Sequence, residues 1–321
     1  MPDGSHTPPF AAQAFRRRWW PRLRTALIVI FFLLVAGLLV IQARQVDWRE
    51  VAGGIRGYGA GTLVAAAALA SAGHLLYTTY ELLARRYTGH RLRWSRVMSI
   101  AFVSYVINLN LGPLIGAMAF RFRLYSRFGI GRGTIARVLG FSIVSNWLGY
   151  LLLAGVLFSL RVVVLPADWD IGAAALQALG AVMIAVVAVY LWSCARARRR
   201  SLSMREFVVE LPPLPLAALQ VASSCASWMT MGAILFVLLG QQVAYPVVLG
   251  VLLLAAVAAL LTHIPAGLGV LEATVVLLLG HRVPTAELLA AVLTYRAFYY
   301  LMPLVPALAV FLWLEARRYR P

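Results

Sequence analysis

Two long apolar segments of this chain are broken at their centres, and these breaks decide the fold. The first segment, Val97–Phe120, reads NLNLGP at Asn108–Pro113, and the second, Val247–Gly280, reads HIPAGLG at His263–Gly269. Proline interrupts a helix because it lacks a backbone N–H, and glycine weakens one because it loses the most freedom on ordering. Val97–Ile107 forms only about 16 Å of helix, roughly half of a hydrocarbon core of about 30 Å. We therefore expect each segment to enter a membrane, turn and leave on the same side.

The composition around these breaks is that of a membrane protein. Hydrophobic residues make up 62% of the 321 residues and charged residues 12%, about half the usual charged share of a soluble domain. The sequence predicts an all-α polytopic membrane protein with one membrane domain over residues 25–316, a disordered basic segment at 1–24 and a short tail at 317–321. The six expected full spans are Thr25–Gln42, Gly59–Leu83, Ile135–Leu160, Ile171–Trp192, Pro215–Leu239 and Ala286–Leu314.

The basic residues decide the topology. The net charge is +18, and the arginines lie in clusters between apolar runs, so we expect no nucleic-acid partner, which would require a basic face on a soluble fold. If both broken segments are re-entrant and the N-terminus is inside, 23 arginines face the cytoplasm and 5 face outward. If both segments cross, the split is 14 against 14. The positive-inside rule favours two re-entrant hairpins, with both termini in the cytosol of a bacterial inner membrane.

The two hairpins then open to opposite sides of the membrane. Each lies between two full spans, so the chain contains two span–hairpin–span units of inverted orientation. This is the layout of inverted-repeat transporters, in which paired broken segments mark the substrate site near the middle of the membrane. The hairpin turns are expected at Gly112, Pro113, Gly116, Pro265, Gly267 and Gly269.

Charged and polar residues within apolar segments are the candidates for function, because they are costly in a bilayer. Glu272 follows the second turn and Arg296 lies in the last span, so the two form either a headgroup site or a structural ion pair. His263 beside the second turn either binds a headgroup or, as we favour, is a neutral residue bonded to a backbone carbonyl. Asn108 and Asn110 bind freed backbone groups at the first turn, the favoured role, or a ligand. Arg121 is either a cytosolic anchor or a contact for anionic lipid at a cavity mouth.

Several classes of site have no signature here. We find no dinucleotide or phosphate-binding loop and no zinc-protease or serine-hydrolase motif. We expect no catalytic residues, no metal and no cofactor, and a transporter rather than an enzyme.

The two breaks also resemble a known family. The run His263–Glu272 followed by Thr294–Pro303, together with Asn108–Arg121, is similar to the membrane domain of lysylphosphatidylglycerol synthetases/flippases, over about Thr25–Arg317. The second turn departs from the family pattern at Ala266, where glycine is usual. The resemblance implies a domain that moves aminoacylated phospholipid between leaflets, while a separate cytosolic domain performs the aminoacyl transfer. We expect this chain to be a stand-alone relative without that cytosolic domain.

The expected function is therefore a lipid or amphiphile flippase. The candidate substrate-binding residues are Arg121, Glu272, Arg296, His263, Asn108, Tyr295 and Tyr299. The expected partners are membrane lipids and a separate cytosolic lipid-modifying enzyme. Two alternatives stay open: an intramembrane enzyme acting on lipid-linked substrates, and a membrane scaffold for such a synthetase.

Overall fold

A computed structural model describes residues 49, 53, 55–162, 173–196, 201–204, 207–262 and 267–316. The chain divides into two compact units, Met1–Asp47 and Trp48–Pro321, and the second is described below. The basic segment expected at 1–24, the first expected span and the tail at 317–321 lie outside the described residues, as do His263 and Pro265.

The second unit is helical, as the sequence predicts. Its helices are α3 (Ala60–Thr88), α4 (Trp94–Leu111), η1 (Pro113–Phe120), α5 (Arg121–Arg127), α6 (Arg132–Ser159), α7 (Ala173–Arg196), α8 (Leu214–Leu238), α9 (Tyr245–Thr262), α10 (Val270–Leu279), α11 (Thr285–Arg296), η3 (Ala297–Leu301) and α12 (Leu304–Ala316). The segments η1 and η3 are π-helical. Between α7 and α8, strands β1 (Ser201–Met204) and β2 (Phe207–Glu210) pair antiparallel, with Ser201 opposite Glu210.

Within the described residues, six helices are long and apolar enough to cross a membrane. They are α3, α6, α7, α8, α9 and the combined helix Thr285–Ala316. Five of these coincide with expected spans, and α9 is the difference. With 18 residues, α9 is longer than a half-membrane arm. Helix α4 also has 18 residues, about 27 Å, because it begins at Trp94, before the apolar run.

Glycine sets the boundaries of several helices. Helix α3 ends at Gly89, which has φ +70° and donates its N–H to the Arg85 carbonyl. This left-handed conformation is easy for glycine and costly for other residues. Arg85 and Arg86 lie in the last turn of α3, where a positive charge is favourable beside the negative end of the helix dipole.

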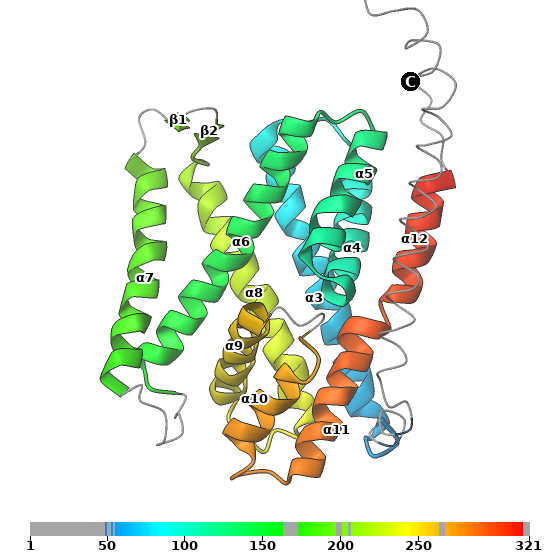
Figure 1. Ribbon diagram of the computed structural model, residues 1–321, viewed down its shortest axis with the longest axis vertical. Coiled ribbons are helices and arrows are strands. Elements are labelled where there is room, and N and C mark those ends of the chain that lie inside the picture. Colours follow the sequence, from blue (N-terminus) through cyan, green and yellow to red (C-terminus); the bar gives the residue numbers. More distant parts are fainter. Residues whose placement is uncertain are drawn as a thin grey trace, which may run out of the picture. The chain divides into compact units, whose positions relative to one another are not determined.

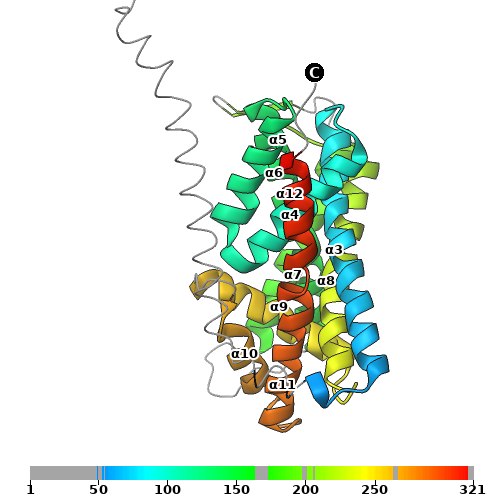
Figure 2. The ribbon, with the colours of Figure 1, turned by 90° about the vertical axis from the view of Figure 1, so that its right-hand side faces the viewer.

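Each broken segment forms a helical hairpin. Hairpin 1 consists of α4, η1 and α5, and hairpin 2 consists of α9 and α10. Figure 1 shows hairpin 1 beside the half of the long helices that contains the end of α3, and hairpin 2 beside the opposite half. In Figures 1 and 2 both turns point toward the middle of this helical unit. That the hairpins are re-entrant in a bilayer, and that they form an inverted repeat, stay predictions.

Small residues let the long helices approach closely. A Cβ atom on Gly180 of α7 would lie 2.7 Å from the Gly155 carbonyl oxygen of α6, and one on Gly149 would lie 2.3 Å from Ser224 Oγ of α8. Neither distance is possible for a real Cβ, so these contacts require glycine. Close backbone packing through glycine is typical of helices in membranes, where burial of apolar surface against lipid supplies no driving force between helices.

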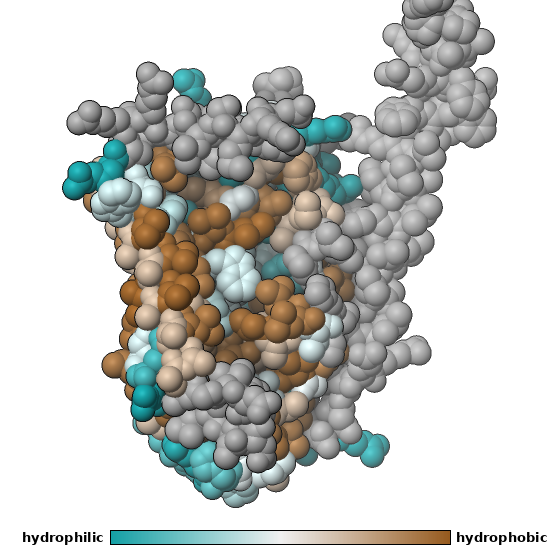
Figure 3. Space-filling view, turned by 60° about the vertical axis from the view of Figure 1, so that its left-hand side comes forward, coloured by the Kyte–Doolittle hydropathy of each residue, from teal (hydrophilic) through white to brown (hydrophobic). Residues whose placement is uncertain are grey.

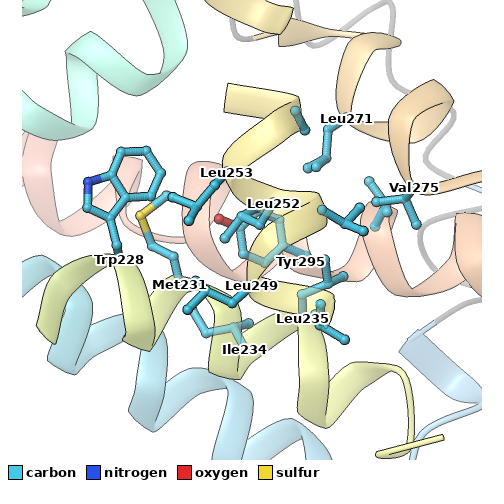
Figure 4. Close-up of a cluster of buried hydrophobic side chains, with 14 of the residues drawn as sticks. Trp228, Met231, Ile234, Leu235, Leu249, Leu252, Leu253, Leu271, Val275 and Tyr295 are labelled. Atoms are coloured by element: carbon cyan, nitrogen blue, oxygen red, sulfur yellow. The ribbon is translucent and has the colours of Figure 1, made fainter. Parts of the chain in front are cut away.

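A cluster of buried apolar side chains fixes hairpin 2 against the long helices. In Figure 4, side chains of α8, α9, α10 and α11 point toward one another, among them Met231, Leu252, Val275 and Tyr295. Val275 and Tyr295 are fully buried. The packing of these four helices sets the distance between the second turn and the last span.

The described arginines gather at one end of the helices. Figure 1 shows that α3, α7 and α12 end there and that α6 begins there. This end contains Arg85, Arg86, Arg91, Arg93, Arg96, Arg123, Arg127, Arg132, Arg137 and Arg196, whereas Arg56, Arg161 and Arg282 belong to the opposite end. We call the first the arginine-rich end. Its location in the cytosol stays a prediction.

Candidate functional site

Two Arg–Glu ion pairs, one buried and one partly exposed, link the hairpins to the long helices. One joins Arg296, at the end of α11, to Glu272, in the first turn of α10, and the other joins Arg121 of hairpin 1 to Glu81 of α3. A charge inside an apolar bundle persists only when it is paired and hydrogen-bonded. We therefore examine each pair as a candidate site.

Arg296 grips the second hairpin at its turn. Its Nε donates to Glu272 Oε1 at 2.5 Å, and its Nη2 donates both to Glu272 Oε2 at 3.0 Å and to the Gly267 carbonyl at 2.7 Å. The two parallel bonds to one carboxylate are the bidentate geometry for which the planar guanidinium is suited. The pairing that the sequence suggested for Glu272 and Arg296 is thus present in the fold.

The backbone places Glu272 and Gly267 in reach of Arg296. Gly269 caps α10 with φ +79°, and Gly267 has φ +58°, conformations that favour glycine. Glu272 lies in the first turn of α10, where the positive end of the helix dipole stabilises a carboxylate. The Glu272 side chain is 17% exposed and that of Arg296 is 8% exposed, so this pair retains some access to its surroundings.

Arg121 lies deeper than the sequence suggested. Its side chain is 1% exposed, so it is neither a surface anchor nor a contact at a cavity mouth. Its Nε donates to Glu81 Oε1 at 2.6 Å, its Nη1 to the Ala117 carbonyl at 2.9 Å and its Nη2 to the Tyr77 hydroxyl at 3.5 Å. The hydroxyl of Tyr125 donates to the second oxygen of Glu81 at 2.5 Å. The guanidinium turns inward because Glu81 offers the counter-charge that a buried cation needs.

The first turn depends on two glycines. Gly112 has φ +84° and donates its N–H to the Asn108 carbonyl. A Cβ on Gly116 would lie 2.0 Å from the backbone nitrogen of Asn108, so η1 packs on α4 only with glycine there. Pro113 is the first residue of η1, where its missing N–H costs nothing.

The neighbouring Asn110, rather than Asn108, binds freed backbone groups at this turn. The Asn110 amide donates to the Val106 carbonyl at 2.9 Å and to the Tyr300 carbonyl at 3.1 Å, so it joins hairpin 1 to η3. The side-chain oxygen of Asn108 is buried without a hydrogen bond. Asn108 thus contributes its backbone to the turn, and its side chain does not fill the role that we favoured.

Tyr295 and Tyr299 are fully buried beside Arg296. Their rings stack at 5.6 Å between centroids, and the hydroxyls of Tyr299 and Tyr105 form a hydrogen bond at 2.9 Å. Tyr105 belongs to α4 and in turn stacks on Tyr77 of α3. A continuous tyrosine cluster therefore connects the surroundings of Arg296 to those of Arg121.

The sequence missed Glu81 as the partner of Arg121. The available signal was an acid within an otherwise apolar span, on one helical face with His74 and Tyr77. Such an acid predicts a cationic partner, although nothing in the sequence shows which arginine, 40 positions away, would meet it.

The surface has two concave features. Figure 3 shows a hollow at mid-height of a largely apolar face, with more hydrophilic residues at its base. A cavity of about 400 Å³ lies near the arginine-rich end, lined by Arg86, Tyr87, Leu211, Pro213, Pro215, Leu216 and Leu219. None of the candidate substrate-binding residues that the structure describes lines this cavity. In the described ranges, no three His, Cys, Asp or Glu residues are grouped so that they could hold a metal ion.

A chain with these broken helices and paired charges can be assigned to a class of membrane protein by comparison with known families. Residues 26–307 match the family described as Lysylphosphatidylglycerol synthase TM region, and the chain belongs to that family. It is 43% identical over 299 residues to Inner membrane protein YbhN of Escherichia coli (strain K12), covering 93% of this chain and 94% of that protein. It is 29% identical over 295 residues to a Synechocystis sp. protein with the name "Uncharacterized protein slr0712", covering 90% and 91%. The resemblance inferred from the sequence is confirmed, and both relatives are matched over almost their whole length.

Proposed function

We propose that this polytopic membrane protein moves a phospholipid or a similar amphiphile between the leaflets of a bacterial cytoplasmic membrane. The observation that carries the proposal is the partly exposed Arg296–Glu272 pair at the turn of hairpin 2. Arg296 is bidentate to a carboxylate, and a lipid phosphate offers the same pair of oxygens to a guanidinium. Glu272, once released, can hold an amine of the headgroup.

The exchange of Glu272 for a lipid phosphate at Arg296 gives a reason for this ion pair. An isolated arginine inside the membrane is too costly, so it needs a counter-ion between transport events. Glu272 serves as that counter-ion, and it separates from Arg296 when the lipid phosphate binds. The Arg121–Glu81 pair is the equivalent at hairpin 1, and its complete burial fits a state in which hairpin 1 is closed while hairpin 2 is accessible.

A leaflet-exchange assay tests this proposal. The purified full-length protein is reconstituted into vesicles that contain a fluorescent anionic phospholipid, and the label exposed on the outer leaflet is quenched with a membrane-impermeant reductant. We expect exchange by the unmodified protein, and loss of at least about tenfold in Arg296→Ala and Glu272→Ala, which corresponds to about 1.4 kcal/mol. Arg282→Ala, an exposed arginine at the opposite end, is the matched control and should exchange lipid normally.

Each outcome has a distinct meaning. Unchanged exchange in both Arg296→Ala and Glu272→Ala would overturn the assigned site. Absence of exchange by the unmodified protein with every lipid tested would overturn the function. Conversion of the lipid into a new compound, detected by mass spectrometry, would support the intramembrane enzyme instead.

A further inference from the structure

A buried histidine in the middle of α3 has an unused basic nitrogen. His74 is 4% exposed, and its Nδ1 lies 2.8 Å from the Ala70 carbonyl oxygen. A carbonyl only accepts hydrogen bonds, so Nδ1 carries the proton and the lone pair is on Nε2. Nε2 is buried and has no hydrogen-bond partner. A buried acceptor without a donor requires an explanation, and readiness to take up a proton is one.

Three aromatic rings surround His74. The centroid of its ring lies 4.7 Å from that of Tyr299, 5.4 Å from that of Tyr105 and 5.9 Å from that of Phe102. Aromatic rings attract a cation that lies over one of their faces. These three side chains come from η3 and α4, so His74 lies where α3 meets both hairpin 1 and the break in the last helix.

Ring contacts and hydrogen bonds connect the surroundings of His74 with the arginine-rich end. Tyr77 lies one turn along α3 and stacks on Tyr105, and its hydroxyl accepts from Arg121. Arg121 pairs with Glu81, which accepts from Tyr125. The ring of Tyr125 lies 5.8 Å from the ring of His90, which belongs to the loop between α3 and α4.

His90 is the last residue of this line. It is partly exposed, and burial together with the charge of Arg85 lowers the pKa of its ring, against the opposing effect of Glu81. His90 is therefore mainly neutral at pH 7, and both of its ring nitrogens are buried without a hydrogen-bond partner.

Glu81 supplies the negative charge that a protonated His74 needs. It lies seven residues, about two helical turns, beyond His74 on the same face of α3. While Arg121 holds Glu81, this charge is compensated, and movement of Arg121 toward an anionic ligand would release it. The titratable groups on the elements packed around His74 are Tyr77, Tyr80 and Glu81 of α3, Tyr105 of α4, Arg121 of hairpin 1, Cys225 of α8 and Tyr299 of η3.

We propose that His74 is a proton-binding site inside the membrane domain. One proton binds Nε2 and converts the imidazole to imidazolium, and only His74 changes its charge in this step. A second part, that this protonation accompanies lipid movement, rests on the proposed function.

The first experiment examines the site without any transport. The full-length protein is labelled with ¹⁵N at its five histidines and its imidazole resonances are followed from about pH 5 to 8.5 by NMR. His74 is assigned by its loss in His74→Gln or, if that variant does not fold, by elimination with single variants of the other four. We expect a change from the Nδ1–H tautomer to the doubly protonated ring as the pH falls. A His74 ring that stays neutral over the whole range in folded protein would overturn the site.

The second experiment examines the coupling. Leaflet exchange is measured in vesicles with a pH gradient of either sign. We expect the gradient to change the rate several-fold in the unmodified protein and in the control His281→Gln, an exposed histidine, and to have no effect in His74→Gln. If the pH gradient does not change the rate of lipid exchange by the unmodified protein, the coupling is overturned. Absence of all exchange would count against the proposed function, and the NMR titration would still decide the proton site.

Discussion

Replacing Glu81 by glutamine removes one negative charge and leaves the shape of the side chain almost unchanged. Arg121, 1% exposed, then has only neutral partners, namely the Ala117 carbonyl, the Tyr77 hydroxyl and the amide oxygen of the substituted side chain. Loss of one member of a buried ion pair costs about 3–5 kcal/mol, because the remaining charge is uncompensated. Two unit charges about 4 Å apart at an effective dielectric constant of about 20 give a similar value, about 4 kcal/mol. We therefore expect Glu81→Gln to lower the free energy of unfolding by about 3–5 kcal/mol.

The assay is a detergent titration of the purified protein in mixed micelles, with helix content followed by circular dichroism. Glu315→Gln is the matched control. Its carboxylate pairs with Arg123 and Arg127 through side chains that are 21–31% exposed, so its loss should cost less than about 1 kcal/mol. The double variant Glu81→Gln, Arg121→Gln removes both buried charges and should be more stable than Glu81→Gln alone. A cost below about 1 kcal/mol for Glu81→Gln, or a double variant that is less stable still, would refute the reasoning.

Three further outcomes follow from local geometry and charge. Gly116→Ala should lower the melting temperature by several degrees in a thermal melt, because its Cβ would lie 2.0 Å from the backbone of Asn108; an unchanged melt would mean that η1 does not pack as described. Gly180→Val should destabilise the contact of α7 with α6, because even a Cβ there would lie 2.7 Å from the Gly155 carbonyl, and faster proteolysis of the α7 region would report it. Burial lowers the pKa of His90 below its unfolded value of about 6.5, so the unfolded chain takes up the proton first and stability falls as the pH drops below about 6.5. His90→Gln should therefore lose less stability between pH 8 and 5.5 than the unmodified protein, and equal losses would contradict this account.

The sequence predicts the helices and their breaks well, because both follow from local chemistry. Apolar runs of sufficient length identify α3, α6, α7 and α8, and glycine at 112 and 269 marks the two turns by its backbone freedom. The apolar pattern does not show whether α9 is a half-membrane arm or a full span, because both have the same pattern. Periodicity does not show how far a helix extends before its turn.

The sequence predicted one part of the candidate site and missed another, and the difference between the two parts has a physical reason. Glu272 and Arg296 were recognised together because each is a charge in an apolar segment close to a break. Glu81 was missed as the partner of Arg121 because the pairing depends on how hairpin 1 packs against α3, and many arginines compete for one acid. The role of binding freed backbone groups was expected of both Asn108 and Asn110. The Asn110 side chain fills it and that of Asn108 does not, because their spacing places them on different faces of α4.

The bond from Asn110 to the Tyr300 carbonyl has a mechanical consequence. Pro303 lacks an N–H, so the last helix is weakened between η3 and α12, and the amide of hairpin 1 supports it at this point. Hairpin 1 therefore cannot rotate without either bending the last helix at its break or losing that support. Because Arg296 lies about two turns before the same break and holds the turn of hairpin 2, a displacement at one hairpin is transmitted to the other through a hinge of only a few residues.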